Sequence, residues 1–423
     1  MIEPGQLEHP RRRAAVIFIL VTVFIDILSF GIIIPVLPHL IIELVGGSIA
    51  TAAVWASGFG TVYMLMQFIA SPIQGALSDR FGRRAVILIS CLGLGTDFIV
   101  MALAPVLWLL FIGRAISGVC SASFTTSYAY IADITPAQKR AAAFGLLGAA
   151  FGLGFIIGPA LGGMLGHIWI RLPFWVSAGL ALTNFLYGLF VLPESLPRAR
   201  RSCGIEWKHA NPVGSLLLLK RYPQVFALAV VFFLMALAQY SLNSTFVLYT
   251  DYRYGWGTLA VGGALAVVGL CTAIVQGGLV RPLVPKFGER RLMLAGLGFA
   301  ILGYILFGLA PHAWMFMAAI PLLCLGGLAG PPAQSIMTHE VDPREQGRLQ
   351  GALSSLRSLA GIIGPLLFAN LFALFISKHA PVHDLSGISF LLAAALTVAA
   401  LWLTARATRG MRTPAATTEN EPT

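Results

Sequence analysis

Long apolar stretches alternate with short polar or charged segments along almost the whole chain of 423 residues. Most of these stretches reach the roughly 20 residues that cross a bilayer core as a helix. Because backbone polar groups cannot stay unpaired in lipid, such stretches are predicted to be α-helices. Twelve spans are predicted, at 14–38, 51–77, 85–104, 106–132, 141–166, 172–192, 223–250, 258–280, 292–310, 313–338, 348–376 and 386–405.

A charged segment separates the first six spans from the last six. The sequence therefore predicts an all-α integral membrane fold with twelve transmembrane helices in two six-helix halves. The predicted parts are an N-terminal segment 1–13, a first half 14–192, a linker 193–222, a second half 223–406 and a polar tail 407–423.

Composition supports this class of protein. Hydrophobic residues make up 57% of the chain and charged residues only 11%, whereas a soluble protein carries roughly 25% charged residues. A cytosolic enzyme, a secreted disulfide scaffold and a nucleic-acid-binding domain are therefore excluded.

The formal net charge of +11 is explained by where the basic residues lie. Nearly all of the 28 Lys and Arg residues lie on one predicted side, and only Arg171, Arg253 and Lys378 lie on the other. By the positive-inside rule, both termini and the linker are predicted to be cytoplasmic. The positive charge then reflects topology and attraction to anionic lipid, and no nucleic-acid partner is expected.

No residue pattern indicates a metal site, a cofactor or a catalytic centre. No histidine falls in the middle of a span, and no nucleotide-binding GxxxxGK[ST] motif occurs. The cysteines are odd in number and lack metal-ligand spacing, so apolar packing is expected for the four inside spans. The five are Cys91, Cys120, Cys203, Cys271 and Cys324. An enzyme is not predicted.

Two sequence patterns recur at the same offset in the two halves. The loop Gly75–Arg84 after the second span is similar to Arg281–Arg290 after the eighth, which aligns Gly82 with Gly288. The Gly158-Pro159 pair of the fifth span aligns with Gly364-Pro365 of the eleventh at that same offset. Parallel halves with a site between them at the membrane midplane are typical of secondary transporters.

Three motifs carry a resemblance to the major facilitator superfamily, in particular to its twelve-span drug:proton antiporters. They are the loop Gly75–Arg84, the span-4 sequence Gly113-Arg114-Ala-Ile-Ser117-Gly118, and the span-5 sequence from Gly154 to Gly163 that is typical of antiporters. The chain is more specifically similar to the tetracycline-resistance efflux family in Asp26–Gly31, Pro35–Pro38, Leu147–Gly154 and Gly361–Phe368. The resemblance implies proton-coupled drug export.

The sequence departs from that family at two positions. Family members carry a histidine four residues before the span-8 glutamine, where this chain has Thr272 before Gln276. They also carry an aspartate in span 9, where this chain has Ala300. Both family residues are tied to proton movement, so the resemblance does not specify tetracycline as the substrate.

Four ionisable residues lie well inside the predicted spans, namely Asp26, Asp97, Arg114 and Arg357. Such groups cost about 2.5–3.5 kcal/mol each to insert and are functional by default. At 1.5 Å per residue, Asp26 is roughly 18 Å, Asp97 roughly 20 Å, Arg114 roughly 18 Å and Arg357 roughly 15 Å from the cytoplasmic end. The four therefore share one layer near the midplane.

The roles of these residues leave alternatives. Asp26 is expected to be the primary proton-titrating group with Arg114 as the fixed charge that modulates it, or the two form a permanent ion pair that locks spans 1 and 4. Asp97 is expected to contact protons or a substrate cation, or to make a polar packing contact. Arg357 is expected to contact a substrate anion or pair with Asp97, or else to snorkel or line its helix.

A drug-sized pocket needs a few placed polar groups among apolar ones. The candidates are Gln276, Gln67, Tyr63, Asn243 and Tyr304, and hydrogen bonds between helices are the alternative for each. The match to the family strengthens only Gln276.

Two further motifs are expected to act in conformational change. The cytoplasmic loop is expected to form a charge latch in which Arg83 approaches Asp133, or simply to carry topology signals; its residues are Gly75, Asp79, Arg80, Gly82, Arg83 and Asp133. In span 5, Gly154, Gly158 and Gly162 form one smooth face that is expected to pack against the opposite half, with Pro159 and Gly163 beside it. Close packing without a role in coupling is the alternative.

The predicted function is proton-coupled efflux of amphiphilic drugs or antibiotics, of the tetracycline type or of many types, across the bacterial inner membrane by a monomer that works by alternating access. The expected partners are the small-molecule substrate, protons and the lipid bilayer. One alternative is a metabolite or siderophore carrier that acts as an exporter, symporter or uniporter on the same scaffold. A more distant alternative is a receptor or scaffold that no longer transports.

Overall fold

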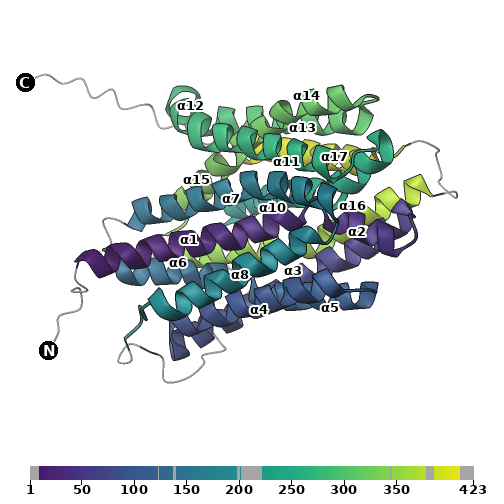
Figure 1. Cartoon of the computed structure of the whole chain (residues 1–423). Helices are drawn as coiled ribbons and strands as arrows, with labels where there is room; N and C mark the ends of the chain where they lie inside the picture. The colour runs from purple at the N-terminus through teal and green to yellow at the C-terminus, as the bar shows by residue number, and fades with distance from the viewer. Residues whose placement is uncertain are drawn as a thin grey trace, which may run out of the picture. The chain divides into compact units, whose positions relative to one another are not determined.

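The computed structural model describes residues 9–121, 123–136, 140–197, 201, 222–342, 345–377 and 385–409. Within these residues the regular structure is entirely helical (Figure 1). Most of the predicted linker, the tail from residue 410 and Lys378 lie outside the described residues.

The first part of the chain forms α1 (His9–Ile33), α2 (Leu37–Leu44), α3 (Ile49–Phe81), α4 (Arg83–Leu103), α5 (Leu107–Cys120), α6 (Ser123–Ile134), α7 (Arg140–Ile168) and α8 (Leu172–Val191). The second part forms α10 (Pro223–Tyr254), α11 (Thr258–Ala273), the π-helix η3 (Ile274–Leu279), α12 (Val280–Phe287), α13 (Glu289–Leu309), α14 (Ala313–Cys324), the 3₁₀-helix η4 (Leu325–Ala329), α15 (Gly330–His339), α16 (Gln346–Ile376) and α17 (Ile388–Ala407).

Eleven helical segments of the described chain are long and apolar enough to cross a membrane. The fourth predicted span, 106–132, is present as two shorter helices, α5 and α6, and α5 has only 14 residues. Large side chains such as Phe190, which is 83% exposed, and Ile168, which is 74% exposed, fit a surface that faces lipid. The all-helical membrane fold is confirmed, whereas the count of twelve stays a prediction.

The recurring loop has the same local geometry at both of its positions. Gly82 lies between α3 and α4 with φ +105°, and Gly288 lies between α12 and α13 with φ +78°. Each N–H donates to a carbonyl at the end of the preceding helix, that of Ser78 or Val284. Because positive φ strains residues with a Cβ, glycine is required at both turns.

The helices group into two compact units that do not follow the order of the sequence. Unit 1 contains Met1–Asn211, Asn243–Gly269 and Gly361–Asp384. Unit 2 contains Pro212–Leu242, Leu270–Ala360 and Leu385–Thr423. Helices α10 and α16 therefore each contribute one end to each unit.

In unit 1, α1 packs along both α7 and α8, α4 packs against α8 and α5, and α3 packs against α5. Buried side chains of α1, α4, α6 and α7 form its core, including Phe18, Ile87, Tyr130 and Leu147. In unit 2, α13 packs against α17, α14 and η4, around a separate core that includes Met293, Ile336 and Leu353. Each unit thus has its own buried centre.

Candidate functional site

Asp26 lies in the middle of α1 and is held by a buried amide. The Asn184 side chain of α8 donates from Nδ2 to Asp26 Oδ1 at 3.4 Å. One turn before Asp26, the Thr22 hydroxyl donates to Asn184 Oδ1 at 3.1 Å. Asn184 is 1% exposed and Thr22 is fully buried. A neutral hydrogen-bond network between α1 and α8 therefore orients the Asp26 carboxyl group.

Asp97 lies in α4 and is completely buried. The Ser117 hydroxyl of α5 donates a short hydrogen bond to its Oδ2, whereas its Oδ1 has no hydrogen-bond partner among the described residues. Gly113 leaves the space for this carboxylate, because a Cβ there would lie 2.6 Å from Asp97 Oδ1. Two residues of the span-4 motif therefore contact Asp97: Ser117 donates a hydrogen bond to it, and Gly113 leaves room for it.

Arg114 belongs to the same motif and is only 7% exposed. Its guanidinium carbon lies 4.4 Å from the centre of the Tyr63 ring of α3, and Asp97 acts on it electrostatically. No described ion pair within 4 Å joins Arg114 to Asp97, and no described contact joins it to Asp26. The structure therefore groups Arg114 with Asp97 and Tyr63.

Arg83 is the centre of a cluster at the loop between α3 and α4. Its Nη1 lies 2.5 Å from Asp79 Oδ1 and donates to Ser78 Oγ at 2.6 Å. Its Nε donates to Asp133 Oδ2 at the end of α6, at 3.2 Å. Arg83 thus ties α3 and α6 to the start of α4, and the latch role stays a prediction.

Glu194, which follows α8, completes this cluster and was missed by the sequence analysis. Its Oε1 accepts hydrogen bonds from the Arg83 N–H at 2.9 Å and the Leu196 N–H at 3.1 Å, and its Oε2 lies 3.5 Å from Arg201. Because Gly82 has no side chain to cap α4, Glu194 supplies the missing acceptor.

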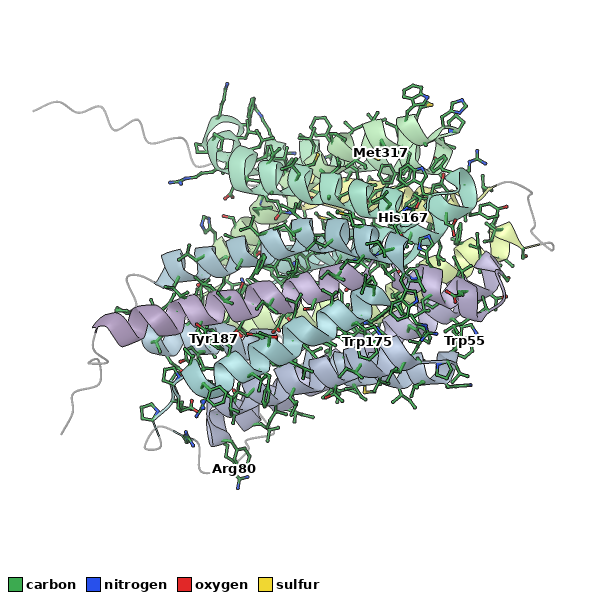
Figure 2. All side chains as sticks on the ribbon, viewed as in Figure 1. Trp55, Arg80, His167, Trp175, Tyr187 and Met317 are labelled. Carbon is green, nitrogen blue, oxygen red and sulfur yellow. The ribbon has the colours of Figure 1, made fainter. Side chains whose placement is uncertain are left out.

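The other two loop residues have no described partner outside α3. Any Cβ at Gly75 would have no atom within 4 Å, so packing does not explain glycine there. Arg80 lies over its neighbour Phe81 and points away from the helices, at the other end of α3 from Trp55 (Figure 2).

The predicted partner of the glycine face in α7 was wrong. Gly154, Gly158 and Gly162 lie against α1, in the same half of the sequence, since a Cβ at each would press on residues of 27–32. The next face of the helix meets the other half, because Gly163 and the carbonyl oxygen of Pro159 lie against Gly262 of α11. Residues one position apart point about 100° apart on a helix, so the two faces have different neighbours.

Unit 2 contains Gln276 inside the π-helix η3, where its side chain is exposed. The two positions that depart from the family both contact span 10. The Thr272 hydroxyl donates to Cys324 Sγ at 3.7 Å. Ala300 lies against Gly326, because a Cβ added at Gly326 would be 2.8 Å from the Cβ of Ala300. Neutral contacts therefore occupy both positions.

The remaining substrate candidates differ in exposure. Tyr63 and Tyr304 are 7% and 4% exposed, and Ser241 lies close to the Tyr304 hydroxyl. Gln67 is partly buried, whereas Asn243 and Arg357 are exposed. The structure thus leaves Asn243, Arg357 and Gln276 as the accessible members of the set.

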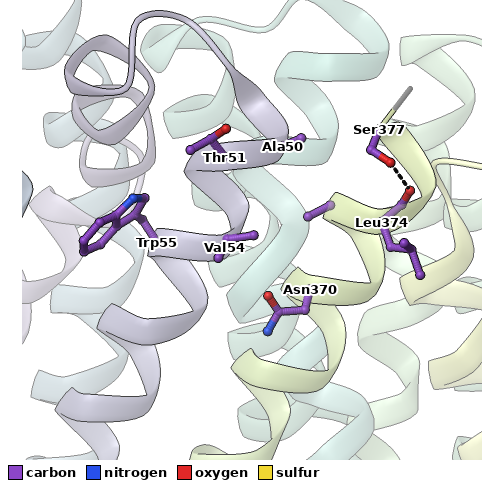
Figure 3. Close-up of a pocket in the computed structure, with 8 residues that line it drawn as sticks. Ala50, Thr51, Val54, Trp55, Asn370, Leu374 and Ser377 are labelled. Carbon is purple, nitrogen blue, oxygen red and sulfur yellow. Dashed lines mark hydrogen bonds between the residues drawn. The ribbon is translucent and has the colours of Figure 1, made fainter. Parts of the chain in front are cut away.

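At the end of α3 away from Arg83, unit 1 holds contacts between residues far apart in sequence. Asn370 of α16 donates to Ser57 Oγ at 3.2 Å, and the Thr61 hydroxyl donates to the Ile362 carbonyl at 3.2 Å. A pocket of about 450 Å³ lies beside them and contains none of the predicted site residues. Its lining is Ala50, Thr51, Val54, Trp55, Asn370, Ala373, Leu374 and Ser377 (Figure 3).

The described residues contain no group of three or more side chains able to hold a metal ion. Carboxyl groups inside the spans of an all-helical membrane protein mark substrate or proton pathways, which is the pattern typical of transporters.

Comparisons with known proteins also indicate a transporter. The Major Facilitator Superfamily model matches residues 19–365. The tetracycline resistance protein of class C from Escherichia coli is 38% identical over 390 residues, which cover 92% of this chain and 95% of that protein. The class G protein of Vibrio anguillarum is 38% identical over 366 residues, covering 85% and 91%. The chain therefore belongs to the major facilitator superfamily and, within it, to the family of the tetracycline resistance proteins.

The fold is also similar to that of a solved transporter structure. The crystal structure of the nucleoside transporter NupG superposes with a TM-score of 0.74 at 13% identity, over 94% of this chain and all of that one. The eleven candidate spans and the relatives from Gram-negative bacteria identify a multi-pass transporter of the inner membrane, not an enzyme.

Three residues of the site were not found from sequence, namely Asn184, Ser117 and Glu194. Asn184 gave a usable signal, because it is the one asparagine in the span 172–192 and buried amides need partners. Ser117 stood in a recognised motif, but nothing in the sequence paired it with Asp97.

Proposed function

We propose that this protein exports amphiphilic drugs across the inner membrane in exchange for protons, by alternating access. The observation that carries the proposal is the pairing of the two carboxyl groups inside the spans, of which Asp26 is partly buried and Asp97 is buried. Asp26 is held by an amide and Asp97 by a hydroxyl, and no described ion pair holds either one. Asp26, whose described hydrogen-bond partner is neutral, can gain and lose a proton without leaving a buried cation unpaired, whereas protonation of Asp97 also changes the electrostatic environment of buried Arg114.

The proposal includes the finer architecture. Helices α5 and α6 together make one span, which gives twelve in two six-helix halves, with both termini in the cytoplasm. This arrangement is supported by the repeated glycine turns at Gly82 and Gly288 and by the distribution of basic residues.

Conformational exchange is supported by contacts at the two ends of unit 1. Residues far apart in sequence meet where Gly163 faces Gly262 and where Ser57 faces Asn370. The cluster around Arg83 lies at the opposite end of α3. We assign these two regions to the outer and inner gates, which open in turn.

The relatives named tetracycline resistance proteins support drugs as the cargo. The test is a drug-susceptibility panel in an efflux-deficient bacterium that expresses the wild type, Asp26→Asn or Asp97→Asn. The panel contains tetracyclines, phenicols, fluoroquinolones and lipophilic cations. Glu43→Gln is the matched control, because Glu43 is exposed at the end of α2.

We expect resistance that Asp26→Asn abolishes, that Glu43→Gln keeps and that a protonophore removes. In everted vesicles, the same drugs should dissipate a preformed proton gradient when the chain has both Asp26 and Asp97, and should not do so when these residues are changed to Asn. A flat panel from a chain that reaches the membrane would refute drug export and favour a metabolite carrier. Resistance that survives both Asp→Asn changes would refute proton coupling through these residues.

A further inference from the structure

Helix α16 exposes two different faces. Gln350, Ser354 and Arg357 are all exposed and lie within about 60° of one another around the helix. The exposed residues of its later turns are apolar and lie roughly 105–155° around the helix from the centre of the polar face; they are Ile363, Leu366, Leu367 and Leu374. The apolar face suits lipid, so the polar face is the one that faces water or cargo.

Arg357 is the only charged residue of the polar face beyond the first turn of α16. It follows Gln346, the start of the helix, by eleven residues, which is about 17 Å along the axis. A bilayer core is about 30 Å thick, so a lipid phosphate does not reach this depth. Snorkelling serves residues near helix ends and does not account for an arginine placed here.

The guanidinium group of Arg357 has an aromatic neighbour and no acidic one. It lies over the Phe232 ring of α10, with its carbon 5.4 Å from the ring centre. No carboxylate of the described residues lies within 4 Å of it. Arg114, by contrast, is buried against Tyr63 and near Asp97. Arg357 is thus an exposed cation inside a predicted span that has no carboxylate partner among the described residues.

The face of α10 that carries Phe232 continues with polar groups. Gln239 and Asn243 follow Phe232 by seven and eleven positions, so the three lie within about 40° around the helix. Both amides are exposed. On the polar face of α16, Gln350 accepts a hydrogen bond from the exposed Gln334 of α15 at 2.9 Å. Gln239 of α10 and Gln350 of α16 thus each lie about two turns, or about 10 Å along the helix axis, from the contact of Arg357 with Phe232.

We propose that Arg357 and Phe232 form an anion-binding site, and that the cargo carries a carboxylate, sulfonate or phosphate group beside a flat apolar body. A guanidinium binds such groups through two parallel hydrogen bonds. The Phe232 ring packs against the apolar body, and Gln239 hydrogen-bonds its polar edge. This inference rests on the proposed function, because it names the chemical class of the exported substrate.

The first experiment compares probes that share one aromatic body and differ in charge. Naphthoate is the anion, naphthamide the neutral form and naphthylmethyl-trimethylammonium the cation. Binding of each to the purified full chain in nanodiscs is measured by equilibrium dialysis, with empty nanodiscs subtracted. We expect naphthoate to bind about tenfold or more tightly than naphthamide, and the cation to bind most weakly.

The variants separate charge from shape. Arg357→Gln should remove the preference for naphthoate, whereas Arg357→Lys should weaken it because the two-pronged geometry is lost. Phe232→Leu should weaken all three probes by a similar factor. Arg348→Gln is the matched control, since Arg348 is an exposed arginine of the same helix that pairs with Glu345 near its start.

Equal binding of the three probes to the wild type, or a preference for naphthoate that survives Arg357→Gln, would overturn the proposal. If Arg357→Gln fails to fold, Arg357→Lys and the wild-type probe series still decide it. Proton-driven export of drugs without any preference for anions would refute this inference and leave the proposed function standing. Selective naphthoate binding by a chain that drives no proton-linked transport would refute the proposed function and leave the anion-binding site standing.

Discussion

Two adjacent glycines of α7 have different neighbours, so alanine should have a different effect at each. A Cβ at Gly162 would lie 2.7 Å from the carbonyl carbon of Ile32 and 2.8 Å from its Cα. A Cβ at Gly163 would lie 2.9 Å from the Cα of Gly262 and 2.5 Å from the carbonyl oxygen of Thr258. The first contact joins α7 to α1, and the second joins it to α11.

The size of the perturbation follows from these distances. Ordinary contacts of a Cβ begin at 3.4 Å, and the carbonyl oxygen of Ile32 lies closer still than its carbonyl carbon, so α1 must move by more than about 0.7 Å to accept Gly162→Ala. The obstacle is backbone, which cannot turn away as a side chain does. The shift also disturbs the close approach of Gly158 to Gly31, which lie on the same two helices. Overpacking of this kind costs about 1–3 kcal/mol.

Thermal unfolding of the purified chain in detergent measures this cost. Gly148→Ala and Gly152→Ala are the controls, because a Cβ at either has no atom within 4 Å. They also gain the helix propensity of alanine, about 1 kcal/mol, that Gly162→Ala gains. Gly162→Ala should unfold several degrees below both controls, and an equal melting temperature would refute the packing argument.

Gly163→Ala should act on conformation, since its neighbours belong to the proposed outer gate. Loosening of α7 from α11 should expose the residues of α16 that close this end. Labelling of an Asn370→Cys chain by an impermeant maleimide added outside the cell should therefore be faster with Gly163→Ala than with Gly162→Ala. Equal labelling rates would contradict the assignment of this contact to a gate.

Three further changes test other contacts. Arg83→Lys keeps the charge but cannot reach Asp79, Ser78 and Asp133 together, so drug export should slow, and a double-mutant cycle with Asp133→Asn should show non-additive effects. Glu194→Ala removes the acceptor at the start of α4 and should cost about 0.5–2 kcal/mol of stability in thermal unfolding, with Glu194→Gln costing less. Asn184→Leu removes the donor to Asp26 and the acceptor for Thr22, so drug-driven proton release from vesicles should fall, whereas Cys91→Ala should leave it unchanged.

The helices could be predicted well because lipid imposes length and apolarity directly on the sequence. The span predicted at 292–310 corresponds to α13 (Glu289–Leu309), and the span at 172–192 corresponds to α8 (Leu172–Val191). The interruption between α5 and α6 was not foreseen, because both sides of it are apolar. The π-helix at Gln276 was not foreseen either, since a single extra residue per turn leaves no periodic trace.

Contacts inside the site were harder to predict than its ionisable residues. The cost of burying charge singles out Asp26, Asp97, Arg114 and Arg357 in any apolar sequence. Their partners come from other helices and are mostly neutral, so no charge pattern reveals them. The glycine face of α7 shows the same limit, because periodicity predicts that a face is smooth but does not tell which helix covers it.

The division of ionisable residues between the two compact units bears on how coupling could work. Asp26 and Asp97 both belong to unit 1, whereas Arg357 belongs to unit 2. The two positions where related efflux proteins carry a histidine and an aspartate are Thr272 and Ala300 of unit 2, and neutral contacts occupy both. In the proposed mechanism, proton binding and cargo recognition therefore rest on different units and share no side chain. Coupling then has to pass through the change of conformation itself, which is why Asp26→Asn and Arg357→Gln test separable steps.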